Sequence, residues 1–184
     1  LGTDQLGRDI LSRLIWATQI SLMAPVIAVS VAPVIGIPFG LLAGYLGGRF
    51  DWIAGRIADA FIALPSLILA LAIIAIFGPG LVNAMLAVGI AMAPALFRVV
   101  RGSTLAVREE TYIDASKIVG GSTWRIMFSH ILPNVRSPLL VMLSIMLSLC
   151  LLAEAGLSFL GLGVQPPTAS WGSMLRIAFD NRFQ

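Results

Sequence analysis

Residues 20–46 read ISLMAPVIAVSVAPVIGIPFGLLAGYL, a run without a single charged side chain. A helix that crosses a bilayer needs about 20 consecutive, mostly apolar residues. This stretch is long enough to cross with some tilt. It therefore predicts a membrane-spanning helix and sets the fold class of the chain.

The composition of the whole chain agrees with a lipid-embedded protein. Hydrophobic residues make up 58% of the 184 residues, charged residues only 11%, and the mean hydropathy is +0.96. A soluble domain averages about 25% charged residues, so a water-soluble domain is excluded and membrane lipid is the expected solvent. The net charge is +3, but the twelve basic residues are spread along the chain, which is a poor footprint for nucleic acid.

Three further apolar stretches approach the length of a span: residues 57–77, 81–101 and 138–163. Pro65 and Pro94 interrupt two of them, and we expect bends there because proline removes a backbone donor. The four stretches predict an all-α fold, a polytopic transmembrane helical bundle in which residues 1–184 form a single domain.

The basic residues predict how the bundle is oriented. Residues 47–56 and 98–137 lie on one side of it and hold eight of the twelve. Cytoplasmic loops carry an excess of Lys and Arg, so we expect a cytoplasmic loop at 102–136 and an outer loop at 164–184. The chain opens on LGTD and ends without closing its last hairpin, so we also expect a longer protein with a further span at each end.

Small residues recur every four positions along the first stretch. This spacing places them on one face of a helix, and such strips allow two membrane helices to approach closely. We therefore predict a close helix–helix contact along Ala24, Ala28, Ala32, Gly36, Gly40 and Gly44.

Two acidic residues lie at or inside the predicted spans, where a charge needs a partner or water. Asp59 follows Arg56 by three residues, which favours an ion pair between them near a helix end. Glu154 lies in AEAG, well inside the last span. It either hydrogen-bonds within the bundle, the reading we favour, or lines an aqueous pathway with a possible gating role.

The sequence lacks the residue combinations that a catalytic or metal-binding site requires. Lys117 is the only lysine and follows Ser116, so the chain has no phosphate-binding P-loop. His130 and Cys150 are single residues of their kind, which leaves no metal site and no intrachain disulfide. We expect no enzyme activity and no cofactor bound by this chain.

The polar segment 109–134 predicts two short helices around a break. Gly120 and Gly121 would end the first, because glycine tolerates left-handed closing conformations. Ser122 or Thr123 could cap the second, and Pro133 would end it. The pair is more apolar than a free loop requires, so it either docks a soluble partner or packs on its own bundle, and the segment alone does not separate these readings.

This segment resembles the EAA loop of ABC-importer permease subunits, which runs Glu-Ala-Ala, three residues, Gly, nine residues and Ile-x-Leu-Pro. The matching positions here are Asp114, Ala115, Ser116, Gly120, Ile131, Leu132 and Pro133. Asp114 replaces the Glu, Ser116 replaces the second Ala, and His130 falls where the pattern has Ile. Gly120 and Pro133 keep their spacing.

Motifs outside the loop extend the resemblance over nearly the whole chain. They are similar to the dipeptide, oligopeptide and nickel branch of these permeases, and closer to its C-type than to its B-type subunit. The motifs are LGTDQLGRD at 1–9, FIALPS at 61–66, IFGP at 76–79, LSFLGLG at 157–163, and QPP at 165–167 followed by WG at 171–172.

The resemblance implies a type I ABC importer permease fold in a bacterial or archaeal cytoplasmic membrane. It implies as partners a second homologous permease subunit, two ABC ATPase subunits and an extracytoplasmic substrate-binding protein. The ATPase would bind ATP and Mg and hydrolyse the ATP. It would contact the permease at the helix that carries Asp114, Ala115, Ser116 and Gly120. Dipeptides, oligopeptides or nickel chelates would be the substrates. The alternatives are an ion-coupled secondary transporter and a membrane assembly subunit.

Overall fold

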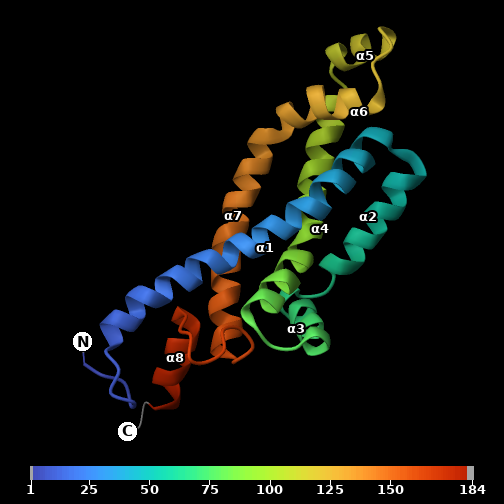
Figure 1. Ribbon diagram of the computed structural model, residues 1–184. Helices are drawn as coiled ribbons and strands as arrows, with labels where there is room; N and C mark the ends of the chain where they lie inside the picture. Colours follow the sequence, from blue (N-terminus) through green and yellow to red (C-terminus); the bar gives the residue numbers. More distant parts are fainter. Residues whose placement is uncertain (1, 182–184) are drawn as a thin grey trace. The chain divides into compact units, whose positions relative to one another are not determined.

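The computed structural model describes residues 2–181, and its elements in that range are helices (Figure 1). They are α1 (Ile10–Leu46), α2 (Gly48–Ile62), α3 (Ser66–Phe77), α4 (Leu81–Arg108), α5 (Thr111–Ile118), α6 (Thr123–Ile126), a π-helical turn (Met127–Ile131), α7 (Leu132–Phe159) and α8 (Trp171–Asp180). One isolated bridge, between Thr3 and Asp9, is the only β-type pairing in this part of the chain. The all-α prediction is confirmed.

The chain divides into two compact units, each built from segments that are far apart in the sequence. Among the described residues, the first unit comprises residues 2–30, Ser66–Gly89 and residues 147–181. The second unit comprises Val31–Pro65 and Ile90–Met146. Each of the helices α1, α4 and α7 contributes one part to the first unit and its other part to the second unit.

Three continuous helices are long and apolar enough to cross a membrane: Ile10–Leu46, Leu81–Arg108 and Thr123–Phe159. The pair α2 and α3 would make a fourth crossing if it is counted as one span, and residues 63–65 interrupt it. The predicted stretch 57–77 is therefore not one straight helix. The break falls immediately before Pro65, which cannot donate a backbone hydrogen bond and disfavours a helical residue in front of it.

The other helices differ from the predicted stretches mainly at their ends. α1 begins at Ile10 rather than near residue 20, because the carboxylate of Asp9 accepts a hydrogen bond from the N–H of Ser12 at 2.7 Å and so caps the first turn. α4 runs through Pro94 to Arg108 instead of ending near 101. The predicted loop 164–184 contains α8. Counting apolar residues misses these amphipathic ends, since a helix continues past the membrane wherever its polar groups are satisfied.

In the second unit the glycine end of the small-residue strip packs on the backbone of α4. A methyl group added at Gly36 would lie 3.0 Å from the carbonyl oxygen of Ala93, and one at Gly40 would lie 2.8 Å from the Cβ of Val100. One at Gly44 would lie 2.6 Å from the Cβ of Thr104. The strip's alanines are buried as well. The predicted close helix contact is confirmed for these glycines.

In the first unit one short polar segment before α1 is held together by Asp4. Asp4 accepts hydrogen bonds from the backbone N–H groups of Leu6 and Arg8, and its carboxylate also contacts the guanidinium groups of Arg8 and Arg13 at 2.7 and 3.1 Å. Burial raises the pKa of Asp4, but these hydrogen bonds outweigh it, so the net pKa lies below its ordinary value. This segment is thereby tied to the first turn of α1.

Candidate functional site

The segment between α4 and α7 folds as a short helix, a tight turn and a second short helix. α5 ends where Gly120 adopts φ +86°, and the N–H of Gly121 returns to the carbonyl oxygen of Ser116 at 2.9 Å. The hydroxyl of Ser122 then accepts a hydrogen bond from the N–H of Arg125 and caps α6. The predicted glycine break and serine cap are both confirmed.

This segment has an apolar inner side and an apolar tip that nothing covers within the part of the chain that the structure describes. Ile113 of α5 and Ile126 of α6 are fully buried and form the apolar inner side of the helix pair. Ile118 and Val119, in contrast, are 86% and 88% exposed directly before the glycine turn. The turn therefore presents two adjacent aliphatic side chains that are accessible to another molecule.

The predicted docking residues divide into an exposed and a buried group. Asp114, Ala115 and Gly120 are exposed, Ser116 is half-buried, and Asp114 pairs with Lys117 at 2.9 Å. Ile131 is fully buried, Leu132 is half-buried and Pro133 is exposed. The first group is therefore accessible to a partner, whereas Ile131 is covered by the chain itself.

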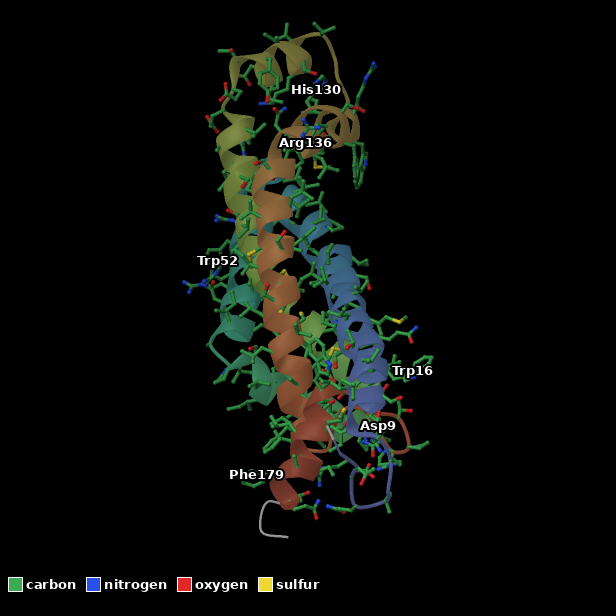
Figure 2. All side chains as sticks on the ribbon, turned by 90° about the vertical axis from the view of Figure 1, so that its left-hand side faces the viewer. Asp9, Trp16, Trp52, His130, Arg136 and Phe179 are labelled. Carbon is green, nitrogen blue, oxygen red and sulfur yellow. The ribbon has the colours of Figure 1, made fainter. Side chains whose placement is uncertain are left out.

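The prediction that Pro133 ends the second helix is wrong. α6 passes through the π-helical turn Met127–Ile131 straight into α7, and Pro133 is the second residue of α7 (Figure 2, where His130 marks the turn and Arg136 the start of α7). A π-helical turn widens the helix by one residue. It thus accommodates a proline that lacks a backbone donor and whose ring would crowd the preceding turn.

Glu154 belongs to a buried polar chain in the first unit. Its side chain is fully buried, and one carboxylate oxygen accepts a hydrogen bond from the hydroxyl of Ser158 at 2.7 Å. The same hydroxyl accepts a hydrogen bond from the N–H of Val164 at 3.3 Å. The other carboxylate oxygen has no hydrogen-bond partner among the described residues. The arrangement holds the turn after α7 back against the helix.

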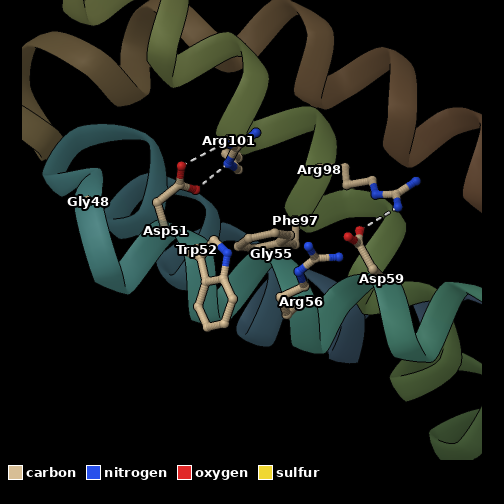
Figure 3. A pocket seen from close by; sticks show the side chains of 9 residues that line it. All are labelled: Gly48, Asp51, Trp52, Gly55, Arg56, Asp59, Phe97, Arg98 and Arg101. Atoms are coloured by element: carbon tan, nitrogen blue, oxygen red, sulfur yellow. Dashed lines mark hydrogen bonds and ion pairs between the residues drawn. The ribbon is translucent and has the colours of Figure 1, made fainter.

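The sequence reasoning missed a cluster of charged residues between α2 and α4 in the second unit (Figure 3). Arg101 makes a two-pronged contact with Asp51, one arm of which measures 2.6 Å. The predicted pair of Asp59 with Arg56 is wrong, because Asp59 pairs with Arg98 at 2.6 Å. Arg56 instead lies 5.8 Å from the centre of the Trp52 ring. Helix spacing pointed only to a partner on α2, whereas the true partners are on α4.

Comparisons with known proteins agree with the helical fold. The chain is similar to a chain of the MetNI methionine ABC transporter in an inward-facing crystal structure, with a TM-score of 0.77 at 20% identity over 95% of this chain and 82% of that chain. At this identity the likeness concerns the fold alone. It confirms the predicted type I importer fold.

Closer relatives are found by sequence. The chain is 46% identical over 97% of its length to a glutathione transport system permease protein of Pectobacterium atrosepticum. It is 46% identical over 98% of its length to a di/tripeptide transport system permease protein of Pseudomonas aeruginosa. It spans 59% of the length of each of these relatives. A family model described as the binding-protein-dependent transport system inner membrane component matches residues 36–179. The chain belongs to that family.

Proposed function

We propose that this chain is a permease subunit of an ATP-driven ABC importer for peptides or glutathione in the bacterial inner membrane. The observation that supports this most is the exposed aliphatic tip at Ile118 and Val119, because it presents an apolar surface at the glycine turn of a segment that resembles a docking loop. The names of the relatives support the substrate class, and nickel chelates remain a further candidate substrate.

On this proposal an ATPase subunit binds segment 109–134 and transmits its own movement to the permease through it. ATP and Mg belong to the ATPase, a second permease subunit completes the pathway, and an extracytoplasmic binding protein delivers the substrate. Asp114 would meet a basic group on the ATPase, while Ala115 and Ser116 keep the helix narrow enough to insert. Such docking can shift the permease only by the difference in contact energy between its two states.

The transport function is tested by reconstituting the full chain with its partner permease and ATPase in vesicles. Uptake of a labelled dipeptide or of glutathione, delivered by the binding protein, is expected to require ATP. Uptake that is driven by an ion gradient without the ATPase would support a secondary transporter instead and contradict the proposal.

The orientation is tested by replacing Ile118 with cysteine. The side chain is exposed, so a membrane-impermeant thiol reagent is expected to label it from the cytoplasmic side of intact vesicles only. Cys150 is buried and provides a low background. Labelling of Cys at position 118 from the outside would place the loop on the wrong side of the membrane for an ATPase.

For Glu154 we propose the structural role. Glu154→Gln keeps an oxygen that can accept from Ser158, so uptake is expected to stay within about twofold of the parent. Ser158→Ala removes the link between Glu154 and Val164 and is expected to lower stability by about 1–3 kcal/mol, measured by thermal unfolding in detergent. A large loss of uptake in Glu154→Gln, with normal abundance and thermal stability, would favour the pathway role instead.

A further inference from the structure

A polar cavity of about 550 Å³ opens between α2 and α4 of the second unit (Figure 3). Three arginines and two aspartates line it: Arg56, Arg98, Arg101, Asp51 and Asp59. The lining therefore carries one positive charge in excess. A cavity with this charge balance, in a helix pair that lies in a membrane, is suited to a ligand that carries one negative charge.

The arginines of this cavity are not equivalent. Arg101 and Arg98 are each held by an aspartate, at 2.6 Å in both cases. Arg56 has no carboxylate partner among the described residues and lies over the ring of Trp52. The excess positive charge is thus centred on Arg56, with the half-exposed Arg98 facing the same cavity.

An apolar groove of about 400 Å³ lies beside the polar cavity and shares Phe97 with it. Ile53, Ile57 and Phe61 line this groove from α2, where they follow one another at helical spacing next to Trp52 and Arg56. All three are exposed in the structure. The chain thus offers an anion site and an apolar track side by side on the same helix pair.

The order of these features along α4 matches the polarity of a lipid. Arg98 and Arg101 lie nearer to the end of α4 at Arg108, and the groove residues Ala93 and Pro94 lie deeper along the helix. The 28 residues of α4 span about 42 Å, against about 30 Å for the hydrocarbon core. If the helix enters the core near Leu81, the two arginines fall at the level of the opposite head groups.

We propose that this face of α2 and α4 binds an anionic phospholipid, with the phosphodiester at Arg56 and Arg98 and an acyl chain along Ile57 and Phe61, which follow Arg56 away from the head groups. Trp52 is 65% exposed beside Arg56, and exposed tryptophans are typical of the membrane–water interface. The proposed orientation places the lipid in the cytoplasmic leaflet. Binding itself does not depend on transport, so the two proposals can fail separately.

The test measures lipid retained by the purified full-length complex after exchange into phosphatidylglycerol or phosphatidylcholine with identical acyl chains. Phosphatidylglycerol is expected to be retained preferentially. Arg56→Gln is expected to lower its retention by about fivefold, the effect of one basic group near a lipid surface. Arg49→Gln removes the same charge from an exposed position outside the cavity and is expected to change retention less than twofold.

A second measurement separates a lipid from a free anion. Phosphatidylglycerol with brominated acyl chains is expected to quench part of the tryptophan fluorescence more strongly than brominated phosphatidylcholine does. Trp52→Phe is expected to remove that difference, while the other three tryptophans remain. Equal retention of the two lipids would overturn the proposal. So would displacement of phosphatidylglycerol by inorganic phosphate, or a loss of subunit association in Arg56→Gln with unchanged lipid.

Discussion

Replacing Gly44 with leucine is expected to prevent the chain from reaching its folded state. The first added carbon alone would lie 2.6 Å from the Cβ of Thr104 and 2.8 Å from the backbone carbonyl oxygen of Arg101. A backbone oxygen in the middle of α4 cannot move aside as a flexible side chain can. Overpacking a core costs about 1–3 kcal/mol and occasionally more, so we expect at least about 3 kcal/mol here and a membrane abundance reduced about tenfold or more.

Alanine substitutions along the same face are expected to lower stability by different amounts, depending on how close the opposite helix lies. The nearest contacts of an added methyl group are 2.6 Å at Gly44, 2.8 Å at Gly40 and 3.0 Å at Gly36. Against each clash stands a gain of up to about 1 kcal/mol, because alanine forms helix better than glycine. We expect thermal stability to fall most for Gly44→Ala and least for Gly36→Ala.

Gly102→Leu is the matched control for Gly44→Leu, because nothing lies within 4 Å of a methyl group added at this exposed position of α4. Its abundance, measured on immunoblots of membranes, is expected to equal that of the parent. If Gly44→Leu accumulates and unfolds like Gly102→Leu, the two helices are not packed at backbone distance.

If the chain functions as proposed, replacing Gly120 with valine is expected to lower ATP-driven uptake strongly while leaving the protein in the membrane. Gly120 has φ +86°, a conformation that costs a β-branched residue about 1–3 kcal/mol. Nothing lies within 4 Å of an added methyl group, so the strain arises in the turn and not from a clash with the core. The turn is expected to relax and carry Ile118 and Val119 away from the ATPase, lowering uptake about tenfold or more, as 1.4 kcal/mol of lost coupling would.

Gly120→Asn separates backbone strain from the loss of glycine as such. Asparagine tolerates positive φ better than other residues with a side chain, so this variant is expected to retain most uptake. Uptake, ATP hydrolysis and membrane abundance are measured on the same vesicles. Normal uptake in Gly120→Val would contradict the docking role of the turn.

The sequence predicted those features that depend on residues close together in the chain. The recurrence of Gly36, Gly40 and Gly44 at intervals of four residues is sufficient to place small groups on one helix face, and the structure has α4 against them. The glycine turn and the Ser122 cap follow from local backbone preferences in the same way. Neither feature requires knowing which helix packs opposite in order to be predicted.

Features that depend on residues far apart were not predictable. Asp51 and Arg101 are fifty positions apart, and their sequence shows only that each charge needs a partner. Helix spacing predicts Arg56 on α2 as the partner of Asp59, but α4 brings Arg98 within 2.6 Å of it. The effect of Pro133 depends on the π-helical turn in front of it, which no residue pattern in the sequence indicates.

The contact of Gly36, Gly40 and Gly44 with α4 has a mechanical consequence. Two helices that are separated by long side chains can shift along one another, because rotamer changes of those side chains accommodate the displacement. Where main chain meets main chain, sliding by one residue would drive each glycine hollow onto a side-chain ridge. A displacement of the end of α4 is therefore transmitted directly to the carboxyl-terminal half of α1. These parts of the two helices move together as one rigid element.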